Sequence, residues 1–191
     1  MKGIVFTEFQ EMVESKFGLE VYDKLVNASN LESGAVYTSV GTYDCKELVQ
    51  LVVKLSEETN IAIPDLIKAF GKHLFTRLAV AFPQFVDDAK SSIELVSQIE
   101  NHIHVEVRKL YPDAELPTFG FKQVDESTFE LHYSSARPFA DLAEGLIEGA
   151  IEHYEDDVEY TREDIKGVQP GTQALFVLYQ KAPTKETLAT V

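Results

Sequence analysis

The chain has 191 residues, enough for one domain with a sizeable core. Its formal net charge is −15, which argues against nucleic acid and anionic membrane surfaces, because both attract lysine and arginine. The single cysteine, Cys45, can form neither an intramolecular disulfide nor a zinc site by itself. No apolar run is long enough for a membrane span or a secretory signal, so we expect a cytoplasmic protein without membrane insertion.

Apolar residues recur at intervals of three and four through the first 110 residues, which predicts a succession of helices. Between the second and third helices, residues 30–41 are rich in turn formers. The third helix is predicted to open with a capping box, in which Asp44 and Glu47 satisfy free backbone donors of the first turn. The predicted helices cover residues 2–17, 19–26, 44–55, 63–82 and 91–111.

Beyond Pro117 the apolar pattern changes to period two, which predicts strands, interrupted by one helical segment. The order is β-β-α-β-β, and it indicates an α+β fold with helices on a small antiparallel sheet. We expect one domain in which residues 1–62 form a helical lobe, 63–183 form an α/β lobe and 184–191 are a frayed tail. The predicted strands cover 119–124, 129–135, 158–160 and 172–180, and the helix covers 138–154.

His104 stands out on the predicted helix 91–111. When that helix is wound at about 100° per residue, His104 lies on the shoulder of the apolar stripe and His102 lies on the polar side. Such a histidine is either a hydrogen-bonded boundary residue or a metal ligand. Zinc needs several converging ligands, whereas haem iron is commonly held by one histidine. The apolar stripe consists of Val96, Ile99, Ile103, Val107 and Leu110.

A second cluster follows about thirty residues later, at Tyr133, Ser135 and Arg137. Residues at i, i+2 and i+4 of a strand share one face, so these side chains point the same way if the strand continues to Arg137. Two hydroxyl donors and a guanidinium fork suit a carboxylate, and the alternative is a local polar network. Leu131 on the same face is apolar, as expected for a strand facing a cavity with polar groups at its mouth.

In this order and spacing the motifs resemble the H-NOX family, the haem nitric oxide and oxygen binding domains, which also include the regulatory domain of soluble guanylate cyclase. The resemblance extends over nearly the whole chain, and it is specific because several weak motifs occur in one order. The matching segments are 1–5, 69–71, 104–112, Pro117, the Tyr133/Ser135/Arg137 cluster and 145–149.

The resemblance implies one haem b per chain, enclosed between the two lobes with residues 1–62 over its distal face. His104 is then the proximal iron ligand. The propionates bind to Tyr133, Ser135 and Arg137, and two residues, Pro117 and Val5, press on the porphyrin and distort it.

The family's oxygen-binding members carry a polar distal trio that includes a tyrosine. Here the matching positions are Phe9, Leu74 and Leu142, none of which has a donor. Bound O₂ gains from a distal hydrogen bond more than NO or CO does, so we expect NO and CO binding without stable O₂ binding. The resemblance also implies no zinc, because the positions of the family's zinc-binding cysteines hold Phe139, Thr161, Asp164 and Thr172.

By the same resemblance, NO binding weakens the iron bond to His104, the lobes shift, and a separate histidine kinase or cyclic-di-GMP enzyme reads the shift. Two other classes of protein, an enzyme and a carrier, would use different features of the sequence. An enzyme would have to use the acidic runs 155–157 and 163–164, which read as solvated charge, so we expect no catalysis. A carrier of an anionic apolar ligand would use Arg137 as its carboxylate clamp and need no metal.

Overall fold

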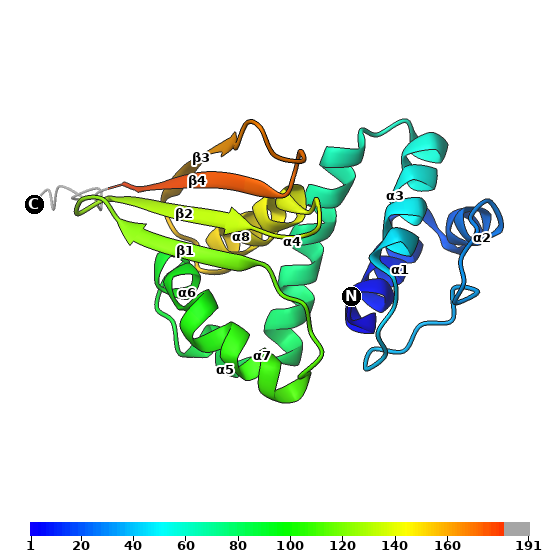
Figure 1. Ribbon diagram of the computed structural model, residues 1–191, viewed down its shortest axis with the longest axis horizontal. Coiled ribbons are helices and arrows are strands. Elements are labelled where there is room, and N and C mark those ends of the chain that lie inside the picture. The colour runs from blue at the N-terminus through cyan, green and yellow to red at the C-terminus, as the bar shows by residue number, and fades with distance from the viewer. Residues whose placement is uncertain (182–191) are drawn as a thin grey trace, which may run out of the picture.

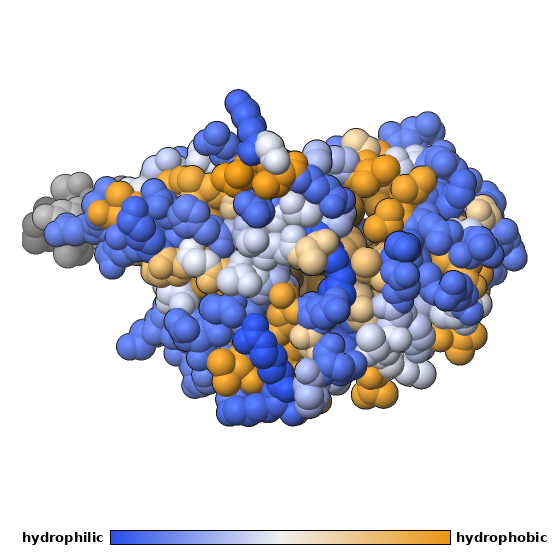
Figure 2. Space-filling view, viewed as in Figure 1, coloured by the Kyte–Doolittle hydropathy of each residue, from blue (hydrophilic) through white to orange (hydrophobic). Residues whose placement is uncertain are grey.

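The computed structural model describes residues 1–181, so the tail predicted for 184–191 lies outside the described residues. It confirms an α+β architecture: helices fill one end of the molecule, and an antiparallel sheet with further helices fills the other (Figure 1). Hydrophilic side chains cover most of the face drawn in Figure 2, with apolar ones in smaller patches. Within residues 1–181, no helix combines the length and the apolar character needed to cross a bilayer.

The N-terminal end is built by α1 (Gly3–Phe17), α2 (Leu19–Asn27) and α3 (Cys45–Thr59). Gly18 separates the first two helices with φ of 94°, a backbone conformation that favours glycine. Apolar faces of all three helices, with part of α4, meet in one core. This core includes the fully buried side chains of Phe6, Phe9, Leu25, Leu51 and Leu55.

The start of α3 differs from the predicted capping box. Asp44 does cap the helix, accepting a hydrogen bond from the Lys46 N–H at 2.9 Å. Glu47 does not reach back to the cap. Its carboxylate accepts from the Ser33 N–H and hydroxyl, at 3.1 and 2.5 Å, and from the Tyr37 hydroxyl at 2.7 Å. The side chain therefore fixes the preceding loop, a long-range use that local spacing does not reveal.

The long helix α4 (Ile63–Ala81) runs between the two ends of the molecule (Figure 1). Pro64 lies in its first turn, where a missing N–H costs nothing, and the helix ends before Pro83 as expected. Its first half packs into the N-terminal core, whereas Phe75 joins a separate cluster with residues of α6 and α8. Both ends of the molecule thus share this helix.

The sheet has the strand order β1-β2-β4-β3, with every neighbouring pair antiparallel. β1 is Thr118–Gln123, β2 is Thr128–Ser134, β3 is Val158–Asp164 and β4 is Gln173–Gln180. β3 is longer than the three residues predicted for it. One face packs against α8 (Ala140–His153), and it includes the buried Leu131 and Phe176.

Helix α8 crosses α4 closely at a pair of glycines. A Cβ atom built on Gly145 would lie 2.0 Å from the Lys68 carbonyl oxygen, and one built on Gly71 would lie 2.4 Å from the Leu142 oxygen. Backbone cannot yield as a flexible side chain can. The absence of side chains at these two positions therefore allows the contact between the helices.

The segment predicted as one helix over 91–111 is interrupted. It consists of α6 (Ser92–Gln98), a π-helical turn η1 (Ile99–Ile103) and α7 (His104–Leu110), and it is preceded by a short helix α5 (Gln84–Asp87) that was not predicted. A π turn inserts an extra residue, so the regular 100° step fails beyond it. The predicted stripe is accordingly wrong at its end, where Leu110 is 58% exposed.

Candidate functional site

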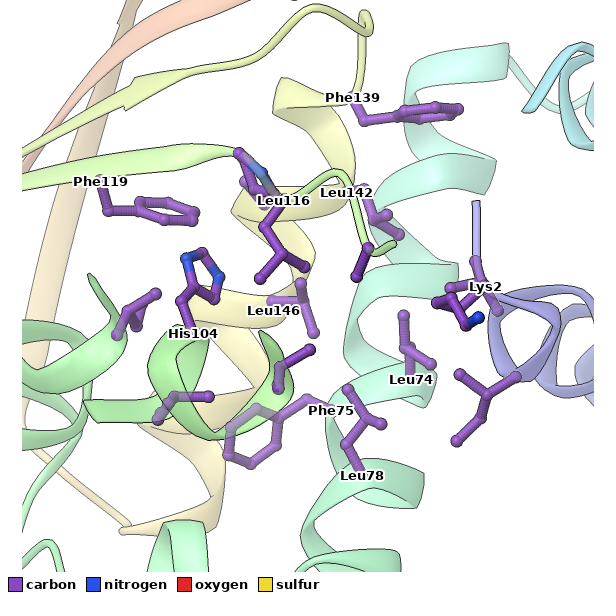
Figure 3. Close-up of a pocket in the computed structure, with 18 of the residues that line it drawn as sticks. Lys2, Leu74, Phe75, Leu78, His104, Leu116, Phe119, Phe139, Leu142 and Leu146 are labelled. Carbon is purple, nitrogen blue, oxygen red and sulfur yellow. The ribbon is translucent and has the colours of Figure 1, made fainter. Parts of the chain in front are cut away.

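A cavity of about 580 Å³ lies between α4, α7, α8 and the N-terminus of α1. Its size falls in the range of small-molecule and cofactor sites. Figure 3 shows leucines from α4 and α8 and the His104 ring pointing into it. The apolar lining includes Ile4, Val5, Leu74, Leu78, Leu116, Phe139, Leu142, Leu146 and Ile147.

His104 is the only buried residue of α7, at 8% exposed. Its position beside the apolar stripe was predicted from a regular helix over 91–111, which the structure does not contain. Its Nδ1 lies 3.2 Å from a carboxylate oxygen of Glu100. A carboxylate only accepts, so Nδ1 carries the proton and Nε2 keeps a free lone pair. Burial lowers the pKa of His104, with Glu100 opposing the shift. The ring is thus a neutral imidazole, the form that binds metals.

Two aromatic rings continue from His104 along the sheet. The Phe119 centroid lies 5.8 Å from the His104 ring and 5.5 Å from the Tyr133 ring. Phe119 and Tyr133 are direct partners in the β1–β2 register, which places both on the face that meets the cavity. Burial raises the pKa of Tyr133, so its hydroxyl stays protonated and can donate a hydrogen bond.

Tyr133, Ser135 and Arg137 all line the cavity, but strand alternation does not bring them together. β2 ends at Ser134, so the condition that the strand continue to Arg137 is not met. The chain turns instead: the Ser135 N–H donates to the Thr172 carbonyl at 2.8 Å, and the Arg137 N–H donates to the Ser135 hydroxyl at 3.0 Å.

The Arg137 guanidinium is held at the cavity mouth by Glu115. It donates to the Glu115 carbonyl oxygen at 3.0 Å and also contacts the Glu115 carboxylate. The guanidinium is therefore already paired with a carboxylate of the same chain where Arg137 lines the cavity. Leu131 does not line the cavity, contrary to the expectation for its face. It is fully buried between the sheet and α8.

Of the remaining candidate residues, Val5, Leu74, Leu142 and Pro117 line the cavity. Phe9 is not among the lining residues. It is fully buried in the N-terminal core, where its ring meets the edge of Phe70 at a centroid distance of 5.2 Å.

Several lining or supporting residues were not singled out from the sequence. Glu100 lies four residues before His104, a spacing that signals a contact on a helix, but helices carry many such pairs. Phe119, Glu115 and Lys2 offered no local signal, because their roles arise from tertiary packing. Phe139, which the sequence places in the predicted helix 138–154 and at a position without zinc-binding cysteine, also lines the cavity.

These features suit one kind of ligand. A largely apolar, partly open cavity accepts a flat apolar group, a neutral imidazole with a free Nε2 can bind a metal at its centre, and a guanidinium at the mouth can pair with acidic groups on its edge. Among residues 1–181, no cluster of three or more metal-ligating side chains offers another centre. Fold and site thus define a protein of the haem-binding class.

Comparison with known proteins agrees. The family model described as Haem-NO-binding matches residues 2–162. The crystal structure of the Fe(II) unliganded H-NOX protein from K. algicida is similar, with 42% identity, a TM-score of 0.89, and coverage of 96% of this chain and 98% of that one.

Two further solved structures are close. The solution structure of the IWP-051-bound H-NOX from Shewanella woodyi in the Fe(II)CO state has 41% identity and a TM-score of 0.82, covering 100% of both chains. The H-NOX protein from S. oneidensis in the Fe(II)NO state has 30% identity and a TM-score of 0.87, covering 95% of this chain and 100% of that one. The chain belongs to the Haem-NO-binding, or H-NOX, family, whose members are haem-based gas sensor domains.

Proposed function

We propose that this protein senses nitric oxide with one ferrous haem b ligated by His104, binds CO as well, does not hold O₂ stably, and signals in trans. The observation that carries the proposal is the buried neutral imidazole facing an apolar cavity, with its Nδ1 tied to Glu100. The haem would supply the iron at which the gas binds. The chain's own residues would orient it, exclude water and pass on the signal.

At the mouth, Arg137 would pair with a propionate carboxylate, with the Tyr133 and Ser135 hydroxyls as further donors. Pro117 and Val5 line the same cavity and would press on the ring from their positions. Titratable groups are few inside, which would keep water and charge away from the metal.

The selectivity for NO and CO over O₂ would come from the lining contributed by α4 and α8. Leu74 and Leu142 have no donor, and Ile4, Val5 and Leu78 in the same cavity lining have none either. An electron-rich bound O₂ would find no hydrogen bond there, and this loss affects NO and CO far less.

The signal would travel through α7. Release of His104 from the metal would free α7 to move, and the segment that follows it lines the cavity as far as Pro117. Asp113 in that segment contacts Lys2 at the start of α1, so a movement of α7 would reach the N-terminal helices. A separate histidine kinase or cyclic-di-GMP enzyme would respond to this movement, as the resemblance implies. We expect neither catalysis by this chain nor a bound zinc.

Absorption spectra of purified protein test the proposal. The wild type should show a Soret band that shifts with NO and with CO. His104→Gly should lose the native ferrous spectrum and regain it when imidazole is added, because free imidazole can occupy the vacated space. His102→Gly is the matched control, since His102 is exposed on η1 and should leave the spectrum unchanged.

A colourless protein that cannot be reconstituted with haem would overturn the proposal. If such a protein bound an anionic apolar ligand in a manner lost on Arg137→Ala, the carrier function would replace the sensor. A Soret band unaffected by His104→Gly would leave a haem protein but remove His104 as its ligand.

A further inference from the structure

Glu100 makes an unusual set of contacts for a residue that lies only 28% exposed beside the cavity wall. One carboxylate oxygen lies 3.2 Å from Nδ1 of His104 and accepts the Phe119 N–H, also at 3.2 Å. The other oxygen accepts from the Arg108 guanidinium at 3.2 Å. Two donors from α7 and one from β1 therefore meet at one carboxylate of η1.

The contacts of Glu100 join three consecutive elements of the chain. Glu100 lies in the π-helical turn η1, His104 begins α7, and Phe119 lies in β1. Within residues 1–181, Glu100 is the sole hydrogen-bond partner of the His104 ring. The orientation of the imidazole thus depends on Glu100 together with packing against Phe119.

We propose that Glu100 is a positioning residue that fixes the tautomer and the ring plane of His104, so that Nε2 faces the cavity. This inference rests on the proposed role of His104 as a metal ligand. A carboxylate that accepts from the far ring nitrogen of a ligating histidine orients the ring and makes it a stronger donor to the metal. Glu100 acts through His104 and does not touch the cofactor.

The two other donors to the Glu100 carboxylate affect how strongly it interacts with His104. The Phe119 N–H anchors the carboxylate to the sheet, and Arg108 neutralises part of its charge. The carboxylate is therefore held in place and shared among three donors, an arrangement suited to orienting the imidazole ring. The strength of the bond from His104 to a metal is then set partly by η1, outside the cavity.

The test uses His104→Gly protein supplied with either imidazole or 1-methylimidazole. Only imidazole retains an N–H that can donate to Glu100. Imidazole should bind to the ferrous haem protein about 10-fold or more tightly than 1-methylimidazole, the usual loss for a second-layer partner of a ligand. In the double variant His104→Gly/Glu100→Gln this preference should shrink several-fold. The matched control adds Glu106→Gln, a change to an α7 carboxylate that pairs only with Lys109.

A second measurement keeps His104 in place. Glu100→Gln should lower the iron–histidine stretching frequency of the ferrous unliganded protein in resonance Raman spectra, and Glu106→Gln should not. A merely structural role for Glu100 would change haem content or thermal stability without moving this frequency.

Two results together would overturn the inference. The preference for imidazole over 1-methylimidazole would be the same with glutamate and with glutamine at position 100, and Glu100→Gln would leave the stretching frequency unchanged. The sensor proposal would survive that result as long as the Soret band still depends on His104. Loss of that dependence would instead refute the proposed function, so the two failures are distinguishable.

Discussion

At the cavity mouth the Arg137 guanidinium is already bound to Glu115. A ligand carboxylate would therefore compete with Glu115 for the guanidinium. In the proposed site, a propionate would have to displace the Glu115 carboxylate, whose side chain is 77% exposed. We expect Arg137→Ala to speed haem transfer to an excess of an apo-acceptor by about 10-fold or more, since hydrogen bonds to charged groups contribute about 1.5–3 kcal/mol. Glu115→Ala should slow the transfer by up to about five-fold, because an exposed ion pair contributes about 0.2–1 kcal/mol.

Competition between Glu115 and a propionate predicts opposite changes in the haem transfer rate for the two variants. A general loosening of the cavity mouth would instead raise the rate in both. Lys109→Ala removes an exposed cation from α7 and serves as the control for charge alone. Equal haem transfer rates for wild type and Arg137→Ala would remove Arg137 from the propionate assignment.

The proposed selectivity against O₂ depends on a missing donor, so adding a donor should change O₂ binding. Ferrous wild type in air should oxidise without forming a stable oxy spectrum. Leu142→Tyr places a hydroxyl on the cavity side of α8, and Leu142→Phe adds a ring of similar size without it. The tyrosine variant should hold O₂ about 10-fold or more tightly than the phenylalanine variant, measured by O₂ titration and oxidation rate. A stable oxy form of the wild type would refute the apolar-pocket argument.

At the level of elements, Glu47 ties the loop before α3 to that helix. It is only 5% exposed, and although burial pushes its pKa up, the hydrogen bonds from Ser33 and Tyr37 outweigh this and leave the pKa of Glu47 below its ordinary value of 4.5. The folded state therefore favours the charged form. Its stabilisation is present above pH 4.5 and is lost as the pH falls through the depressed pKa.

Glu47→Gln should accordingly lower the free energy of unfolding by about 1–2 kcal/mol at pH 7, measured by denaturant titration. The difference from wild type should shrink as the pH falls below about 4.5, because the carboxyl of the unfolded chain then takes up a proton and that of the folded protein follows at its lower pKa. Glu32→Gln changes an exposed carboxylate of the same loop and should have little effect at either pH. A difference that stays constant with pH would show that the charge of Glu47 contributes nothing.

These elements also show which parts of the fold the sequence alone could predict. Periodicity located α1, α4 and the four strands, because burial of one face repeats with the period of the element. It failed at η1, where an extra residue breaks the repeat, and at Glu47, whose partners come from a distant loop. The residue types and spacing of His104 and Arg137 were enough to mark both as candidate site residues, and both line the cavity. The contacts of Glu100 could not be predicted, because one of them forms only when β1 lies beside η1.

At the scale of the whole molecule, the cavity lies where three separate cores meet. The N-terminal core, the core between sheet and α8, and a smaller cluster around Phe75 each bury their own side chains. The space between them is lined by residues such as Leu146 that belong to the edges of these cores. A relative movement of the cores would thus reshape the cavity without unpacking any of them.

One contact spans these parts at the cavity rim. Lys2, with a side chain only 14% exposed, donates to the Thr42 hydroxyl at 2.8 Å and to the Asp113 carboxylate at 3.3 Å, and its ammonium lies 4.9 Å from the Tyr111 ring centroid. Hydrogen bonds from Thr42 and Lys2 hold the pKa of Asp113 below its ordinary value, so the Asp113 carboxylate is charged at neutral pH. The segment that follows α7 is thereby fastened to the start of α1.

Asp113→Asn keeps the shape of this side chain and removes its charge, so it should loosen the rim without touching the cavity lining around His104. We expect the Soret band to be unchanged, and amide hydrogen exchange of residues 111–117 to become roughly two-fold faster or more, as for loss of a single rim ion pair. Glu57→Gln, which breaks a surface pair within α3, should leave that exchange unaffected. Unchanged exchange in Asp113→Asn would mean that the packing of Tyr111 and Leu116 alone holds the segment, and that movement of α7 must reach α1 by another contact.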